Sequence, residues 1–417
     1  MTTRSRIRRS ARGAFAALTL AVLSAMTVPP AAADACDHQC SVDRAWAQQR
    51  ANALDRDAFY NVPEDLPWAP VGSLIRAEAA QDYQLDAGMR ALRILYHSRD
   101  SRGRDVATSG VVVLPAGQAP AGGWPVLADA HGSSGVARDC APSLMKNLWY
   151  GGYLRAVVRA GYALVATDYT GLGANGGPVE FLSKRAEAED VVDALPAARE
   201  AVPELGRDWV ALGHSQGGHA VLGVAELMAR RAEQGDGDRG YRGGVAVAPA
   251  SQLTELFADL GNQSAGAGTV ALIVAGAGAG RRAPAPDDVL TPAAVGRLPV
   301  LAQGCLPVVA ATYGDLLGKD LVTEGGVATM APYLSRNEPG TRPVLGPLLI
   351  QQGTADPIVT TDRTQRLTRR LCALGQSVEY RVYQGYDHNG VLYPSLPDTL
   401  SWIADRFAGK QPPSTCS

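Results

Sequence analysis

The sequence predicts an α/β fold in which a mostly parallel β-sheet is flanked by helices. Short runs rich in Val, Leu and Ala alternate with helix-like stretches from residue 89 onwards, as expected for strands that are buried on both faces. With 46% apolar and 19% charged residues, the composition is that of a globular protein and not of a disordered, collagen-like or coiled-coil chain. A Gly-rich turn at 213–217 also joins one apolar run directly to a helical stretch.

The expected strands are apolar runs bounded by turn-forming residues. They span residues 89–96, 107–114, 124–129, 161–167, 208–213, 244–248, 347–352 and 378–383. The expected helices span residues 147–160, 186–201, 218–234 and 362–374. Pro196 should kink or end the second of these helices, because proline has no amide hydrogen to donate.

Residues 1–33 have the pattern of a secretory signal peptide. An arginine-rich start is followed by an apolar stretch at 13–28, a Pro-Pro break and the small residues Ala31 to Ala33. An N-terminal anchor helix is the alternative, but the apolar stretch is shorter than the roughly 20 residues that a membrane span needs. Arg8 and Arg9 hint at twin-arginine export, and the export route stays open. Removal of this segment takes away five arginines and no acid, which changes the net charge from −2 to −7.

The exported chain is expected to have an N-terminal arm at 34–88 and a core divided into residues 89–249 and 344–417. Within the arm, the Pro-rich stretch 62–70 suggests an extended backbone. The α/β alternation stops between residues 250 and 343, where Ala, Gly, Leu and Val dominate. A structureless loop of that length is unusual in a compact domain. We therefore expect a helical cap, or lid, inserted between the sixth and seventh strands.

Several classes of partner are disfavoured. The near-neutral charge without a basic stripe argues against nucleic acid, and the apolar run 270–280 is too short to span a bilayer. The glycines at 171–176 fit G-x-G-x-x-G, but Gly177 and Pro178 follow, so a loop is expected there and not a dinucleotide site. We expect no cofactor and no metal site, because zinc-type spacings of Cys and His are missing from the sequence.

The six cysteines predict disulfide bonds, since an even number is typical of an exported chain. The spacing does not fix their pairing. Cys36 and Cys40 are close enough in sequence to close a small loop.

The strongest motif is Gly213-His214-Ser215-Gln216-Gly217, which fits G-x-S-x-G. It lies directly after a predicted strand and before a predicted helix, as a nucleophile elbow requires. Glycine at positions 213 and 217 lets the strand and the helix approach closely. Ser215 is therefore the candidate nucleophile.

A serine hydroxyl needs a base and an acid that orients the base, and after such an elbow both are expected later in the chain. His388 follows the last predicted strand and is the candidate base. The competitor His219 lies on the helix behind the elbow, where a buried or hydrogen-bonded histidine is expected.

The candidate acid is Asp356, which follows the seventh predicted strand. Asp362 and Asp387 are alternatives. Asp362 should begin the next helix, where an acid suits the helix dipole. The side chain of Asp387 should diverge from that of His388, its neighbour in sequence.

The oxyanion of an acyl-transfer reaction needs hydrogen-bond donors. One candidate is the backbone N–H of Gln216. The other should come from the loop 131–135, which contains Ser133 and Ser134.

Taken together, the motifs resemble the secretory lipase family of α/β-hydrolases, which includes yeast lipase A and many actinobacterial exported enzymes. The resemblance covers most of the exported chain and is carried by residues 57–60, 94–100, 109–115, 131–135, 139–143 and 168–173, by the elbow, and by Asp356 and His388. It implies a lid between nucleophile and acid, and it assigns the catalytic roles to Ser215, Asp356 and His388. Alignment with yeast lipase A places Ser134 where that enzyme has an oxyanion-binding Asp. The family also implies a disulfide between Cys140 and Cys305.

The expected activity is that of a secreted lipase or carboxylesterase that cleaves hydrophobic acyl esters through an acyl-enzyme. Its expected partner is a lipid or another hydrophobic ester, with a lipid–water interface as a candidate surface. An exported peptidase or amidase is the alternative, since the elbow does not distinguish esters from amides. A binding protein that has kept the fold is a further, non-enzymatic alternative.

Overall fold

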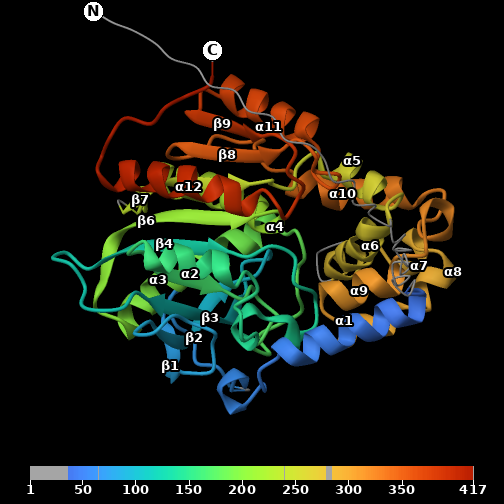
Figure 1. Ribbon diagram of the computed structural model, residues 1–417, viewed down its shortest axis with the longest axis horizontal. Coiled ribbons are helices and arrows are strands. Elements are labelled where there is room, and N and C mark those ends of the chain that lie inside the picture. Colours follow the sequence, from blue (N-terminus) through green and yellow to red (C-terminus); the bar gives the residue numbers. More distant parts are fainter. Residues whose placement is uncertain (1–35, 64, 239, 279–283, 417) are drawn as a thin grey trace, which may run out of the picture. The chain divides into compact units, whose positions relative to one another are not determined.

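The computed structural model describes residues 36–416 except 64, 239 and 279–283, so the expected signal peptide lies outside the described residues. Its centre is a nine-stranded sheet with the strand order β1-β2-β3-β5-β4-β6-β7-β8-β9 (Figure 1). The strands are β1 Leu74–Ala80, β2 Arg90–Arg99, β3 Asp105–Leu114, β4 Trp124–Ala130, β5 Ala163–Thr167, β6 Leu205–His214, β7 Tyr241–Val247, β8 Leu348–Gly353 and β9 Val378–Tyr383. The helices are α1 His38–Asn52, α2 Gly152–Arg159, α3 Lys184–Ala201, α4 Gln216–Glu233, α5 Leu253–Leu260, α6 Ser264–Ala277, α7 Pro286–Val289, α8 Pro292–Val295, α9 Leu306–Tyr313, α10 Gly326–Asn337, α11 Thr361–Ala373 and α12 Leu392–Phe407.

The sheet is parallel from β5 to β9 and antiparallel at the β1 edge. Buried side chains of α3, α4 and α11 pack on one face, and those of α2 and α12 pack on the other. This arrangement confirms the predicted α/β fold with its mostly parallel sheet. The carboxyl ends of the parallel strands lie at one edge of the sheet, and β6, β8 and β9 lead from there into the candidate site.

Three local expectations differ from the structure. The arm at 34–88 contains helix α1 and strand β1, and β1 was missed because its partly exposed sequence lacks a two-residue apolar period. Helix α2 begins at Gly152 and not at residue 147, because Leu148 and Trp149 adopt positive φ angles of 52° and 71°. Helix α3 continues past Pro196 to Ala201, and the proline lies on the exposed side of that helix.

The helices α5 to α10 share a hydrophobic cluster that is separate from those of the sheet. Helix α6 packs tightly against α9, where a Cβ on Gly268 would lie 2.7 Å from the backbone of Ala310. We call residues 250–343 the helical insertion. Helix α1 packs along α9 of this insertion (Figure 1), and the side chain of Gln49 bonds both to the carbonyl of Gln303 and to the N–H of Cys305, each at 2.8 Å.

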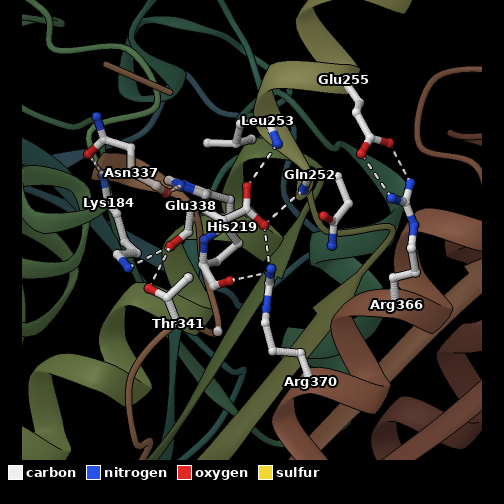
Figure 2. Close-up of polar contacts among 12 residues, drawn as sticks. Lys184, His219, Gln252, Leu253, Glu255, Asn337, Glu338, Thr341, Arg366 and Arg370 are labelled. Atoms are coloured by element: carbon white, nitrogen blue, oxygen red, sulfur yellow. Dashed lines mark hydrogen bonds and ion pairs between the residues drawn. The ribbon is translucent and has the colours of Figure 1, made fainter. Parts of the chain in front are cut away.

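The two ends of the helical insertion meet at Glu338 (Figure 2). Its carboxylate accepts hydrogen bonds from the N–H groups of Gln252 and Leu253, at 2.9 and 2.8 Å, where the insertion begins. It also pairs with Arg370 of α11 in the core. One carboxylate thus joins the entry of the insertion, its exit and the helix that follows β8.

Disulfides join Cys140 to Cys305 and Cys372 to Cys416, and Cys36 and Cys40 are disulfide-bonded as well. The bond between Cys140 and Cys305, which the family resemblance implied, connects the core to the helical insertion. None of the helices within the described residues is long and apolar enough to cross a membrane.

Candidate active site

Ser215 lies between β6 and α4 in a strained backbone conformation, with φ of 58° and ψ of −118°. Non-glycine residues rarely adopt positive φ, and such strain is concentrated at functional sites. A Cβ on Gly217 would lie 1.8 Å from the carbonyl oxygen of Ala130, and one on Gly213 would lie 2.3 Å from that of Gly217. Larger residues at these two positions would force the strand and the helix apart, so the turn requires both glycines.

The structure brings Ser215, His388 and Asp356 together. The carboxylate of Asp356 accepts a hydrogen bond from Nδ1 of His388 at 2.7 Å, which leaves Nε2 without a proton in the neutral ring. This Nε2 lies 2.8 Å from Oγ of Ser215 and can accept the hydroxyl proton. The arrangement is that of a nucleophile, a base and an acid that orients the base.

The acid is fixed by four donors. Oδ1 of Asp356 accepts from the N–H groups of Ile358 and Val359, and Oδ2 accepts from Gln352 as well as from His388. Burial alone would raise the pKa of this carboxyl, but the hydrogen bond and charge of His388, with the bonds from Val359 and Gln352, hold it below its usual value. Asp356 is therefore ionised at neutral pH.

The alternative residues lie elsewhere. Asp362 is in the first turn of α11, is largely exposed and pairs with Arg366. Asp387 is exposed and accepts a hydrogen bond from the N–H of Gly390. His219 is fully buried, and its ring bonds to Glu187 and to the carbonyl of Asn337 at the exit of the insertion (Figure 2). In the described part of the chain, none of these three side chains is hydrogen-bonded to the side chain of Ser215 or of His388.

The structure describes both groups that the sequence offers as oxyanion donors. Gln216 is the first residue of α4, so its backbone N–H has no acceptor within the helix. Its side-chain amide donates a hydrogen bond to Glu187 at 2.7 Å, and this bond fixes the side chain of Gln216. The hydroxyl of Ser134 is buried and, within the described residues, has no hydrogen-bond partner. A buried hydroxyl without a partner is costly, and an incoming oxyanion would satisfy it.

The loop 131–135 is attached to the helical insertion. The carbonyl of Ser134 accepts a hydrogen bond from the N–H of Leu306 at 2.7 Å, and Gly135 forms an isolated β-bridge with Cys305. Gly135 has a φ of 145°, and a Cβ there would lie 2.8 Å from Sγ of Cys140. The disulfide therefore packs directly against the loop that carries the candidate oxyanion donor.

The segments 139–143 and 168–173, which contribute to the family resemblance, meet at a buried carboxylate. Asp168 accepts hydrogen bonds from the N–H and the hydroxyl of Ser143 and from the hydroxyl of Ser109. Burial raises the pKa of Asp168 to about 6, although these bonds lower it. The contacts fix the segment that carries Cys140. The glycines at 171–176 form a loop against β3 and do not open a helix.

Four further residues support the site and were not identified from the sequence: Gln352, Glu187, Tyr150 and His214. The pair Gln351-Gln352 at the end of an apolar strand was a usable signal, because a buried glutamine needs partners. The contacts of Tyr150 and His214 arise from tertiary packing and have no local signature. The cavity beside Gln216, lined by His131, Gly135 and Tyr169 among others, has a volume of about 10 Å³, enough for about one water molecule. No cluster of three or more potential metal ligands occurs in the described ranges.

Comparison with known proteins places this geometry in context. Residues 147–392 match the sequence profile of a hydrolase family described as serine aminopeptidase, S33. A Mycobacterium tuberculosis protein (strain CDC 1551 / Oshkosh) named as a probable inactive lipase is 26% identical over 378 residues, which cover 85% of this chain and 82% of that protein.

Solved structures with a similar fold include a lipase and an esterase. Candida antarctica lipase A in its closed state superimposes with a TM-score of 0.71 at 20% identity and covers 87% of this chain and 89% of its own. The rice cell wall degrading esterase LipA from Xanthomonas oryzae, in a ligand-bound form, gives a TM-score of 0.65 at 17% identity and covers 82% of this chain and 100% of its own.

Proposed function

Because the chain belongs to the serine aminopeptidase S33 family of α/β-hydrolases, we propose that it is an exported serine ester hydrolase acting on hydrophobic acyl esters. One observation carries the proposal: Oγ of Ser215, the imidazole of His388 and the carboxylate of Asp356 form a continuous hydrogen-bonded series. A histidine with a purely structural role, or one in solvent, would have no reason to contact both a serine hydroxyl and a buried carboxylate. The three side chains come from loops at the carboxyl ends of β6, β8 and β9.

The proposed reaction has two halves. In the first, Oγ of Ser215 attacks the ester carbonyl and its proton passes to Nε2 of His388. The imidazolium gives this proton to the leaving alcohol, and the acyl group remains on Ser215. In the second half, His388 takes a proton from water, the hydroxide attacks the acyl-enzyme, and the proton returns to Ser215 as the carboxylic acid leaves. Asp356 stabilises the imidazolium in both halves.

The negative oxygen of each tetrahedral intermediate would be bound by the backbone N–H of Gln216 and the hydroxyl of Ser134. Removal of one such donor typically costs about 10² to 10³ in kcat. Ser134→Ala should therefore lower kcat by roughly this factor, with little change in KM. Ser133→Ala is the matched control, since it removes the neighbouring hydroxyl of the same loop.

Hydrophobic esters fit the surroundings better than small polar ones. The helical insertion is rich in buried Leu, Val and Ala, and the exposed Tyr386 and Tyr393 lie close to His388 in sequence. The similar solved structures include a lipase and an esterase. These observations support lipid or other apolar acyl esters as substrates, presented at a lipid–water interface.

Export is supported by the sequence pattern of residues 1–33 and by the cysteine chemistry. Within the described residues every cysteine is disulfide-bonded, which suits an oxidising compartment. N-terminal sequencing of the secreted protein should begin near Asp34. A mature protein that begins at Met1 would contradict the export proposal.

Two observations favour competing functions. The family description names an aminopeptidase, and the relative from Mycobacterium tuberculosis bears the name of an inactive lipase. The same site could attack an amide, and a protein with a blocked site could bind lipids without cleaving them.

The deciding experiment assays the secreted protein on nitrophenyl esters from short to long acyl chains and on aminoacyl nitroanilides. Ser215→Ala is assayed in parallel. We expect ester hydrolysis that extends to long acyl chains and is lost in Ser215→Ala. Hydrolysis of the anilides alone would establish peptidase activity. If the folded protein hydrolyses none of these substrates, the result would favour an inactive binding protein.

A further inference from the structure

A second hydrogen-bonded series reaches the backbone of His388. The N–H of Gly132 lies 2.9 Å from Oη of Tyr150, and this oxygen lies 3.1 Å from Nδ1 of His214. On the other side of the ring, Nε2 of His214 lies 2.7 Å from the backbone carbonyl oxygen of His388. The series begins in the loop 131–135 and ends at the residue that carries the candidate base.

The chemistry of its members fixes the direction of every hydrogen bond. A carbonyl oxygen can only accept, so Nε2 of His214 carries the hydrogen and donates to His388. Burial, reinforced by the neighbouring His388, lowers the pKa of His214 to about 3, so the ring is neutral and Nδ1 accepts. Burial also raises the pKa of Tyr150, which keeps its proton and donates to Nδ1. The N–H of Gly132 completes the series by donating to the phenolic oxygen.

The backbone around Tyr150 is strained. Leu148 and Trp149 have φ angles of 52° and 71°, and Gly151 has a φ of 51°. Positive φ at non-glycine residues costs about 1–3 kcal/mol each and persists where the surroundings enforce it. This strained turn places the Tyr150 hydroxyl against the loop, and a Cβ on Gly132 would lie 2.3 Å from that hydroxyl. Residue 132 must therefore be glycine for the contact to form.

Ring packing accompanies the hydrogen bonds. The rings of His214 and His388 have centroids 4.7 Å apart, and those of Tyr150 and His214 are 5.9 Å apart in an edge-to-face arrangement. His214 thus holds His388 through both its backbone and its ring.

We propose that Tyr150 and His214 are positioning residues that set the placement of His388 relative to the loop 131–135. Neither residue is assigned a chemical step. By joining the base to the loop 131–135, they hold the proton acceptor and the candidate oxyanion donor of that loop in one fixed geometry. This inference rests on the proposed ester hydrolysis for its kinetic test, but the hydrogen-bonded series itself does not depend on it.

The kinetic test uses Tyr150→Phe, with Tyr153→Phe as the matched control. Tyr153 is a buried tyrosine whose ring lies 6.3 Å from that of Tyr150, and it is not part of the series. Small misplacements of catalytic groups cost about 100-fold in rate, so we expect Tyr150→Phe to lower kcat roughly 10- to 100-fold. KM should stay within about twofold of the wild type, because the lost hydroxyl positions the base and not the substrate. Tyr153→Phe should match the wild type in both constants.

Position 214 supplies a rescue test. The amide nitrogen of a glutamine can reach the position of Nε2 and donate to the carbonyl of His388, whereas leucine cannot. His214→Gln should therefore keep more kcat than His214→Leu. Equal losses in the two variants would overturn the inference, as would a Tyr150→Phe enzyme with the kcat of Tyr153→Phe.

A readout independent of turnover separates this inference from the proposed function. Hydrogen exchange measured by mass spectrometry should show faster exchange in both 131–135 and 386–391 of Tyr150→Phe, and unchanged exchange in Tyr153→Phe. Lack of ester hydrolysis by the wild type would refute the proposed function alone. Unchanged exchange in these two segments of Tyr150→Phe would refute the positioning role, whatever the activity.

Discussion

Removal of the disulfide between Cys140 and Cys305 should reduce both stability and hydrolysis. The bond joins residues 165 apart in sequence, and the loop-entropy relation for that length gives about 5 kcal/mol at 25 °C. Both half-cystines are buried, so the double variant Cys140→Ala/Cys305→Ala also leaves a small cavity, which adds to the cost. The loop 131–135 packs on this disulfide through Gly135. Its loosening should lower kcat about 10- to 100-fold.

The disulfide between Cys372 and Cys416 is the matched control. Cys372 and Cys416 are 44 residues apart, for which the same relation gives about 4 kcal/mol. They join α11 to the C-terminal segment, and neither element carries Ser215, Asp356, His388 or a candidate oxyanion donor. The variant Cys372→Ala/Cys416→Ala should therefore lose a comparable amount of stability but keep the wild-type kcat wherever it is folded.

The assay combines guanidinium unfolding followed by tryptophan fluorescence with initial rates of ester hydrolysis, both in non-reducing buffer. Rates are compared at a temperature at which circular dichroism shows all three proteins folded. Equal kcat values for the two double variants would refute the link between this disulfide and the oxyanion loop. A Cys140/Cys305 variant clearly more stable than the control would refute the entropy argument.

Three further results are expected. Asp356→Asn should lower kcat about 10⁴-fold without unfolding the protein. The amide of the new asparagine can keep the hydrogen bonds from the backbone N–H groups, but it favours the wrong tautomer of His388. A pH–rate profile with the wild-type kcat would contradict this prediction. Burial raises the pKa of Asp129 from 3.8 to about 7, so its ionisation destabilises the folded state. As pH rises from about 4 to about 7, Asp129→Asn should become more stable relative to the wild type, by up to about 1.4 kcal/mol per pH unit. The same difference in denaturant midpoint between variant and wild type at pH 5 and at pH 8 would contradict this prediction. Glu338→Ala should lower the free energy of unfolding by about 2–3 kcal/mol, because it leaves two N–H groups and Arg370 without their acceptor. Glu255→Ala, at an exposed residue, should lower it by less than about 1 kcal/mol. Thermal unfolding that ranks the two variants the other way would refute this reasoning.

Much of the fold was predictable because its signals are local. Eight of the nine strands coincide with apolar runs flanked by turn residues, and the elbow at Ser215 is marked by glycines whose necessity the packing distances explain. Strand β1 was missed because an edge strand that is half exposed has no clear period. The start of α2 was misplaced because tertiary contacts of Tyr150 impose positive φ on its neighbours, against the helical preference of the sequence.

The candidate site was predictable only where the order of residues along the chain limits the choice of each residue. Because His388 is the only histidine after the helix of the elbow, it could be chosen as the base without knowledge of any contact. The support of Gln216 by Glu187 could not be chosen in this way. Glu187 precedes the elbow by a whole strand, and many other acids occur in the chain at similar positions.

The placement of α1 has a consequence for how the chain folds. This helix is the first described element to leave the ribosome, yet it packs on α9, and the side chain of Gln49 bonds to a carbonyl 254 residues later in the sequence. Contacts between such distant segments form late, because the intervening chain must be ordered first. The helix therefore stays without its partner until the core and the insertion are both made. A chain cut short before α9 keeps Ser215 but lacks Asp356, His388 and the helix on which α1 packs, so such truncated products of synthesis cannot assemble the proposed hydrolytic site.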